Sequence, residues 1–411
     1  MSQIIENNNN NNNNWEYLPD IPTFTQYFKQ NDLIELSKVS KGYRSQLKPQ
    51  ALRKVNIDDR VIKYLKLYTK DNNYQYENAI IYLRSDFGNN CHLVREVVIY
   101  RWFSNDLAKD LFTLLPRISN IKIIDCQCYG LKNLISILQD YKYLKHVSIT
   151  SSFRKFKPLL DSVYYSFFYR LSSIHMVIPQ YLAESQLPFD IIDSNYVNLK
   201  RLTIVNNRIL SKLSNCIPSL LYVEFSHEYQ FDSKILKNFI TNNPQLRQIS
   251  ICDWNLNENI VNCLLALRNL YKLEILFKGH EIDSSKLDTE NYSIKHITYK
   301  KHWRYYYSTA VPQILKLCKN LKVCEISDIK CYEHLARDDF PIIDTLLLSE
   351  LSNCDLSELT LGLTKFNRLK FRGSYKFGEI FDQLPQYPNI EWVPKQEYTK
   401  ETDEFTLIKK F

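Results

Sequence analysis

Residues 199–207 read Leu199-Lys200-Arg201-Leu202-Thr203-Ile204-Val205-Asn206-Asn207, which follows the pattern L-x-x-L-x-L-x-x-N. Leu202 and Ile204 alternate with Arg201 and Thr203, so a short strand here would bury one face and expose the other. Asn207 stands where the chain must turn away from the strand. Its side-chain amide can satisfy backbone groups that lack a partner in the sheet. The stretch therefore predicts a strand that ends in a turn.

The same apolar pattern recurs along most of the chain. Its other units begin at Val94, Ile118, Leu144, Leu171, Leu220, Leu246, Leu270, Ile294, Leu321 and Ile343. Successive units lie 21 to 28 residues apart, which is typical of leucine-rich repeats of roughly 20–29 residues. Amphipathic segments with helical spacing lie between them, for example at 234–240 and 259–270.

These spacings predict an α/β leucine-rich-repeat solenoid, with a curved parallel sheet and helices on its convex side. No unit can bury its apolar face alone, so neighbouring units must supply each other's core. The alternative is an ordinary doubly wound α/β domain, whose strands would follow at longer and less regular intervals.

Composition limits the function classes. The chain has 411 residues and a net charge of +8, from 53 basic and 45 acidic residues. This mildly basic balance does not by itself indicate a nucleic-acid partner. With 7 glycines, the chain is poor in the residue that phosphate-binding loops need. It lacks a long apolar run and a signal peptide, so we expect an intracellular protein, cytoplasmic or nuclear, without a membrane span.

The sequence contains no pattern that indicates catalysis. We find no H-E-x-x-H, G-x-S-x-G, Walker or Rossmann signature. The eight histidines are dispersed, and Cys126-x-Cys128 lacks a matching pair of metal ligands nearby. The cysteines are interpreted as buried apolar residues. We expect no enzymatic activity, no catalytic residue, no metal and no cofactor.

The N-terminal region differs from the repeats. An eight-asparagine run at 7–14 is predicted to be disordered, because it cannot bury apolar surface. Residues 24–28 and 33–39 then carry apolar side chains at helical spacing. On these residues alone, the segment is interpreted as a helical cap for the open end of a solenoid.

A family resemblance adds to this interpretation. Leu18-Pro19, followed by Asp32-Leu33…Leu36-Ser37-x-Val39-Ser40-Lys41-x-Tyr43-Arg44, resembles the F-box motif. Ser40 stands for the usual Cys, and Tyr43 for the usual Trp. The first half departs from the motif, because the gap between Leu18 and Asp32 is short and Pro22 falls inside the expected first helix. With its repeats, the chain resembles F-box/leucine-rich-repeat proteins, and its asparagine tract resembles those of social-amoeba proteins.

The resemblance implies a non-catalytic adaptor. The F-box helices would dock onto the Skp-type linker subunit of a cullin-RING (SCF-type) ubiquitin ligase, and the repeats would hold a protein substrate. The residues carried over as contacts with the linker are Leu18, Pro19, Leu33, Leu36 and Val39. Some of these side chains could instead form the small core of the F-box itself.

The expected organisation has five segments. They are a disordered tail at 1–14, an F-box-like helical domain at 15–57, a linker or capping segment at 58–92, the solenoid at 93–394 and a C-terminal tail at 395–411. Within 58–92, residues 80–83 are interpreted as a strand or half a repeat.

Partner binding is expected on the concave face and in one unusual loop. Residues that flank the buried strand positions face the concave side, and this set includes His175, Glu274, His296, Thr298 and Glu325. The candidates for partner binding are Arg201, Tyr222, Glu224, Lys300, Trp303, Arg304, Tyr305, Arg368, Lys370 and Arg372. The last three make one basic strand face, which is either a dock for an acidic or phosphorylated peptide or a solvated surface. The loop at 300–307 combines cations with aromatics, as binding hot spots do, or else folds back onto the core.

Three functions remain open at this stage. The F-box-like segment favours the ubiquitin-ligase adaptor. The shortened first F-box helix favours a plain repeat scaffold with a helical cap and no ubiquitin role. Only the 300–307 loop and the net charge favour a nucleic-acid-binding repeat protein.

Overall fold

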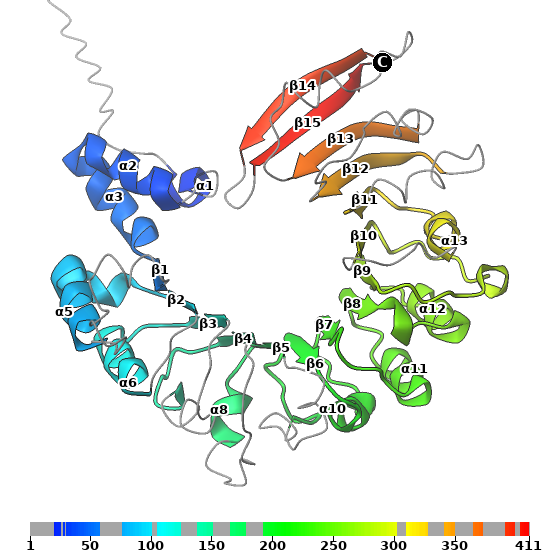
Figure 1. Cartoon of the computed structure of the whole chain (residues 1–411), viewed down its shortest axis with the longest axis horizontal. Helices are drawn as coiled ribbons and strands as arrows, with labels where there is room; N and C mark the ends of the chain where they lie inside the picture. Colours follow the sequence, from blue (N-terminus) through cyan, green and yellow to red (C-terminus); the bar gives the residue numbers. More distant parts are fainter. Residues whose placement is uncertain are drawn as a thin grey trace, which may run out of the picture.

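The computed structural model describes residues 20–25, 28, 30–57, 76–100, 105–124, 138–150, 165–177, 192–301, 310–327, 341–349, 365–372, 391–398 and 403–410. Within them, one 15-stranded sheet runs in sequence order from β1 (Lys54–Ile57) to β13 (Phe366–Arg372), followed by β15 (Asp403–Lys410) and β14 (Glu391–Tyr398). Every neighbouring pair from β1 to β13 is parallel. The sheet lines the inner side of a curved array, and the helices lie outside it (Figure 1). The predicted leucine-rich-repeat solenoid is confirmed.

The repeats supply the remaining parallel strands and the outer helices. The strands are β2 (Glu96–Tyr100), β3 (Asn120–Ile124), β4 (His146–Thr150), β5 (Ser173–Val177), β6 (Arg201–Ile204), β7 (Tyr222–Phe225), β8 (Gln248–Cys252), β9 (Lys272–Phe277), β10 (His296–Lys301), β11 (Val323–Ile326) and β12 (Ile343–Ser349). The α-helices are α5 (Tyr76–Phe87), α6 (Asn105–Leu114), α8 (Tyr165–Tyr169), α10 (Asn207–Lys212), α11 (Ser233–Asn242), α12 (Glu258–Leu265) and α13 (Ala310–Leu317). Short 3-10 turns are η1 (Gly88–Leu93), η4 (Leu213–Asn215), η5 (Asp253–Asn255) and η6 (Ser284–Lys286).

The apolar alternation sets the register of the strands. Leu202 of β6 lies opposite Val223 of β7, which lies opposite Ile249 of β8 and, in turn, Leu273 of β9. All four side chains are buried in one continuous core between the sheet and the helices. A slip of one residue would move each of them to the concave face, so the burial pattern fixes the register.

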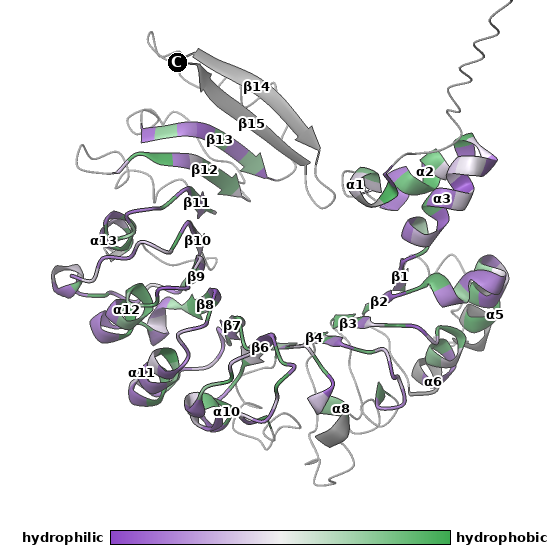
Figure 2. Cartoon of the chain, turned by 180° about the vertical axis from the view of Figure 1, so that it is seen from behind, coloured by the Kyte–Doolittle hydropathy of each residue, from purple (hydrophilic) through white to green (hydrophobic). Residues whose placement is uncertain are grey.

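Helices cover this core because their apolar residues follow the helical period. Leu236, Phe239 and Ile240 bury one face of α11. Hydrophobic and hydrophilic residues are mixed within α10, α11 and α12, as expected for helices with one buried face (Figure 2). Asn206 begins α10 by accepting a hydrogen bond from the Ile209 backbone N–H at 2.9 Å. Asn207, predicted to satisfy backbone groups at this turn, accepts one from the Asp232 N–H of the next repeat at 3.0 Å.

Buried asparagines also link successive repeats. Asn291 donates to the carbonyls of Leu265 (2.6 Å) and Leu267 (3.1 Å) and accepts from the N–H of Ser293 (2.8 Å) and Ile294 (2.7 Å). Each bond satisfies a backbone group that the strand ladder leaves unpaired where helix and strand connect. The repeats are therefore joined by polar contacts as well as by apolar packing.

The N-terminal residues form a small helical unit that precedes β1. It contains α1 (Ile21–Thr25), α2 (Gln30–Val39) and α3 (Lys41–Ala51). Ser40 separates α2 from α3 and accepts a hydrogen bond from the Tyr43 N–H at 3.0 Å. The unit has its own core of Leu33, Leu47 and Ala51. Pro22 lies in the first turn of α1, where a missing N–H costs little.

Three expected boundaries differ from the structure. β1, assigned to the F-box-like domain at 15–57, pairs with β2 and is the first strand of the solenoid. Residues 80–83, expected as a strand or half a repeat, lie in α5, whose Ile80 and Leu83 join the main core. The residues after 394 were expected as a tail, but β14 crosses that boundary and β15 pairs antiparallel with both β13 and β14. Over such short segments, apolar periodicity does not distinguish a helix from a strand, or a strand from a tail.

Other expectations fall partly or wholly on residues outside those described. The asparagine run, Cys126 and Cys128 are among them. None of the described helices is long and apolar enough to cross a membrane. The described residues also contain no group of three or more His, Cys, Asp or Glu side chains placed to hold a metal ion.

Candidate functional site on the concave face

A row of alternating carboxylate and hydroxyl side chains crosses five consecutive strands of the sheet. Glu224 of β7 lies opposite Ser250 of β8, which lies opposite Glu274 of β9. Thr298 of β10 and Glu325 of β11 continue the same register. These side chains alternate along their strands with core residues, so they face the concave side. We call these five residues the central row.

The alternation keeps like charges apart. Adjacent strands lie about 4.8 Å apart, so glutamates on alternate strands have backbones roughly 10 Å apart. Carboxylates directly opposite each other on neighbouring strands would repel. The Thr298 hydroxyl donates a hydrogen bond to Glu325. Positions that flank the row on β9 and β10 supply the cations Lys272 and Lys300.

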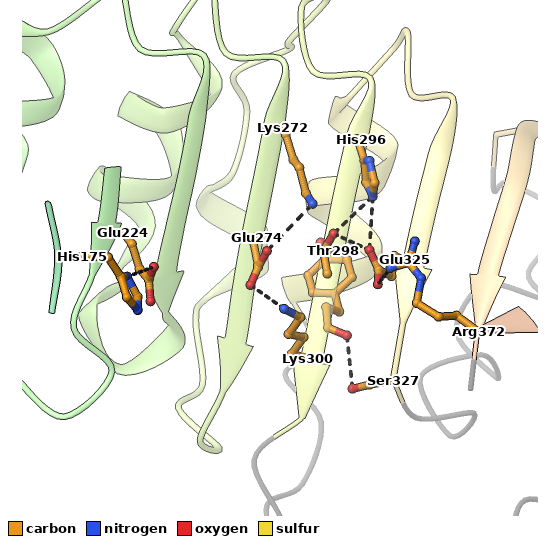
Figure 3. A network of polar contacts seen from close by, with 11 residues as sticks. His175, Glu224, Lys272, Glu274, His296, Thr298, Lys300, Glu325, Ser327 and Arg372 are labelled. Carbon is orange, nitrogen blue, oxygen red and sulfur yellow. Dashed lines mark hydrogen bonds and ion pairs between the residues drawn. The ribbon is translucent and has the colours of Figure 1, made fainter. Parts of the chain in front are cut away.

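Glu325 is the most tightly held residue of the central row. Its Oε2 accepts a hydrogen bond from Thr298 Oγ1 at 3.0 Å and lies 3.4 Å from His296 Nε2. Its Oε1 lies 3.0 Å from Arg372 Nη1 (Figure 3). Burial alone would raise the pKa of this carboxyl. The hydrogen bond with His296, the charge of Arg372 and the Thr298 hydroxyl outweigh burial and lower its pKa to about 2.

Glu274 is flanked by two lysines. Lys300 Nζ lies 2.9 Å from Oε1, and Lys272 Nζ lies 3.9 Å from Oε2. Lys272 begins β9, and Lys300 comes from β10 on the other side of the row. The carboxylate is therefore neutralised from both sides within the sheet (Figure 3).

Glu224 ends the row on the side of the earlier repeats. His175 Nδ1 lies 3.3 Å from Glu224 Oε2 and 2.8 Å from Thr203 Oγ1. Burial raises the pKa of Glu224, but the hydrogen bond and charge of His175, with smaller effects of His227 and Lys300, lower it overall. His175 thus connects β5, β6 and β7.

The predicted binding residues are not a uniform free surface. Arg201 stacks on Tyr222, with its guanidinium carbon 4.9 Å from the ring centroid. In the basic strand face, Arg372 is held by Glu325, and Arg368 Nε lies 3.9 Å from Asp344 Oδ1. Lys370 lies between them on β13 and is half-buried. At least two cations of the expected acidic-peptide dock therefore already have carboxylate partners in the fold.

The candidates of the F-box-like segment differ in their burial. Leu33 is buried in the helical core and Leu36 packs against it, whereas Val39 is exposed. Leu33 therefore cannot contact a partner directly while the unit is folded, and of the two roles left open for it, its burial supports the core role. Leu18, Pro19, Trp303, Arg304 and Tyr305 lie outside the described residues.

Sequence reasoning placed Glu274 and Glu325 on the concave face but did not identify them as the centres of ion-pair clusters. Only their register with cations on neighbouring strands reveals this role. Aligning the repeats by their spacing could have indicated this role, because residues at the same repeat position become neighbours in space. Chemically, the central row offers a polar surface whose carboxylates are already paired with basic side chains outside the row.

Comparisons with known proteins give fold neighbours at low identity. No family model and no curated protein matches the chain. The structure is similar to the yeast Rad7 and Elc1 complex, with 13% identity, 82% of this chain and 90% of that chain covered, and a TM-score of 0.42. It is also similar to the Drosophila Toll–Spatzle complex (11% identity, 71% and 48% covered, TM-score 0.35) and to the TLR13–ssRNA13 complex (13%, 73% and 53%, 0.32). The match spans about half the length of the Toll and TLR13 chains.

Proposed function

We propose that this chain is a non-catalytic protein-binding adaptor. Its helical unit docks a Skp-type linker subunit of a cullin-RING ubiquitin ligase, and its repeats hold a protein partner. The proposal joins the F-box-like residues 32–44 to an extended repeat surface, and it assigns no chemical step to the chain. One observation carries it, namely the apolar side chains that α2 leaves in solvent.

Those side chains are Val39 and Ile34. Val39 is 70% exposed at the C-terminal end of α2, and Ile34 is 37% exposed. Leu33 and Leu36, one helical turn apart, bind the same helix to its core. Apolar residues on the outer side of a short helix are suited to insertion into a partner's groove.

The attachment of the helical unit supports a docking role. Gln30 Nε2 at the start of α2 donates to the carbonyls of Ala51 (2.7 Å) and Lys54 (2.6 Å). These bonds join the first residue of α2 to the end of α3 and the start of β1. A linker bound to α2 would therefore be held in a defined position relative to the repeats.

The test is co-purification of the full chain with a purified Skp-type linker subunit, using two variants matched in exposure. Val39→Asp places a charge on the proposed docking helix. Ile81→Asp does the same on α5, where Ile81 is 63% exposed. We expect the wild-type chain and Ile81→Asp to retain the linker, and Val39→Asp to lose it, with all three unfolding at similar temperatures.

Failure of the wild-type chain to bind the linker, or equal binding by Val39→Asp, contradicts the proposal. The plain scaffold then becomes the better interpretation. It predicts that the helical unit only covers the end of the solenoid. Leu33→Asp would destabilise that unit under either interpretation, so it cannot decide between them and is useful only as a folding control.

A further inference from the structure

The edge of the sheet at which the parallel strands begin carries a regular series of cations. From β2 to β11, the residue before each strand donates its backbone N–H to the carbonyl of the equivalent residue one repeat earlier, as in Tyr271 to Arg247 (2.8 Å) and Lys295 to Tyr271 (2.9 Å). The residues linked in this way are Arg53, Arg95, Ser119, Lys145, Ser172, Lys200, Leu221, Arg247, Tyr271, Lys295 and Lys322. Most are Lys or Arg and none is acidic, so the backbone ladder holds cations in line along this edge.

A groove of about 1240 Å³ opens on the same edge, between the ends of the repeat helices and the starts of β7 to β10. Its lining includes Arg247, Arg268 and Lys295. Two tyrosines, Tyr271 and Tyr292, add aromatic surface and are 54% and 61% exposed. Tyrosine and arginine are the residue types that most often dominate binding energy at protein interfaces. We call this feature the edge groove.

The cations of the edge groove differ from those of the concave face in their partners. On the concave face, Lys300 and Arg372 lie against Glu274 and Glu325. Among the described residues, the side chains of Arg247, Arg268 and Lys295 have no ion-pair or hydrogen-bond partner. A partner at the central row must displace existing ion pairs, whereas an anion in the edge groove would meet unneutralised charge.

We propose that the edge groove binds an extended acidic segment of a partner protein. Carboxylates of the segment would pair with Arg247, Arg268 and Lys295, and its apolar atoms would lie on Tyr271 and Tyr292. In an extended peptide, side chains on one face repeat about every 7 Å, and equivalent positions on adjacent strands lie about 5 Å apart. Acidic residues at every second position can therefore reach successive repeats.

Two features of the lining favour a peptide over a nucleic acid. Glu290 is exposed in the groove, where it accepts a hydrogen bond from Tyr292 Oη at 2.7 Å and pairs with Lys319 at 3.1 Å. A continuous phosphate backbone would meet this carboxylate, whereas a peptide can place a neutral residue there. Gln248 also lines the groove, and its side-chain amide offers the donor and acceptor that a peptide group requires.

The test measures fluorescence anisotropy of a labelled alternating Glu-Ser peptide with the full-length chain. The groove variant is Arg247→Glu/Arg268→Glu. The control is Lys234→Glu/Lys237→Glu on α11, which makes the same change in net charge at exposed positions outside the groove. We expect the groove variant to bind about tenfold more weakly or worse, and the control to bind within about twofold of wild type. Added salt should weaken wild-type binding.

Several outcomes overturn the proposal. They are no binding of the peptide by wild type, equal loss in both variants, or tighter binding of an oligothymidylate that only the groove variant abolishes. The last result would assign the groove to nucleic acid. If Arg247→Glu/Arg268→Glu does not fold, Arg247→Gln/Arg268→Gln replaces it. The inference adds the partner's chemistry to the proposed adaptor, but the assay needs no linker subunit, so it can fail independently of linker docking.

Discussion

Arg372 Nη1 lies 3.0 Å from Glu325 Oε1, so a side chain of β13 reaches past β12 to hold a carboxylate of β11. Glu325 is buried, and its other oxygen is held by Thr298 and His296 from β10. Side chains from three strands, β10, β11 and β13, therefore meet around this carboxylate. Removing one partner of a buried ion pair costs far more than removing an exposed one, because the remaining charge stays desolvated.

The first prediction concerns stability in acid. The pKa of Glu325 falls from 4.5 to about 2 in the folded chain. Its stabilising effect is therefore complete above about pH 4.5 and is lost as the pH falls toward 2. A shift of this size corresponds to roughly 2–4 kcal/mol of unfolding free energy. In urea unfolding measured from pH 7 to pH 3, the unfolding free energy of Glu325→Gln should therefore fall less than that of wild type.

A matched variant tests the assignment to Glu325. Glu274→Gln removes a carboxylate from the same row, but one whose side chain is 18% exposed, against 5% for Glu325. Such partly exposed ion pairs typically contribute less than about 1 kcal/mol to stability. The unfolding free energy of this variant should therefore fall with decreasing pH much as that of wild type does. If the unfolding free energies of Glu325→Gln and wild type fall equally between pH 7 and pH 3, the loss of stability in acid does not come from Glu325.

The second prediction concerns the turn that follows β9. The buried carboxylate of Asp253 accepts hydrogen bonds of 2.9 Å from the backbone N–H groups of Lys278, Gly279 and His280. Gly279 has a φ of 89°, in the region that disfavours side chains. Asp253→Ala should cost about 2–4 kcal/mol of unfolding free energy, and Gly279→Ala about 1–2 kcal/mol. Asp232→Ala, which removes only a helix cap, should cost about 1 kcal/mol.

The third prediction compares two asparagines of adjacent repeats. Asn291 is buried and makes four hydrogen bonds to backbone groups, whereas Asn269 is exposed and makes one, to the Pro244 carbonyl at 3.0 Å. Asn291→Ala should lower the unfolding free energy by about 3 kcal/mol, because buried backbone groups lose their partners. Asn269→Ala should change it by less than about 1 kcal/mol. Equal costs in calorimetry would show that the buried bonds do not join the repeats.

The fourth prediction concerns thiol reactivity. Burial raises the pKa of the Cys318 thiol to about 12, and burial with the neighbouring Asp253 raises that of Cys252 to about 12. Only the thiolate reacts with alkylating reagents. With iodoacetamide at about pH 8, peptide mapping should therefore show slow labelling of both residues and faster labelling of the half-exposed Cys91 and Cys216. In urea the difference should vanish, and fast labelling of Cys318 in the folded chain would contradict the burial argument.

Prediction from sequence succeeded where the pattern is local and repeated. Leu202 and Ile204 indicate a strand because they alternate, and ten similar units at regular spacing indicate stacking. It failed at β14 and β15, where antiparallel strands close the sheet without that spacing. It also left open whether Leu33 contacts a partner, because a helical stripe does not reveal which apolar residues meet other helices.

The parallel solenoid can be derived from the amino-acid sequence, since the repeated apolar spacing allows each unit to bury its face only against its neighbours. Which charges are satisfied depends on how the repeats stack in three dimensions. Repeat stacking places Glu325 beside Arg372, 47 residues later. Within the described part of the chain, it leaves Arg247, Arg268 and Lys295 along one edge without an ion-pair partner. Pairing of charges depends on distance in space across strands, and no local pattern of residues encodes that distance.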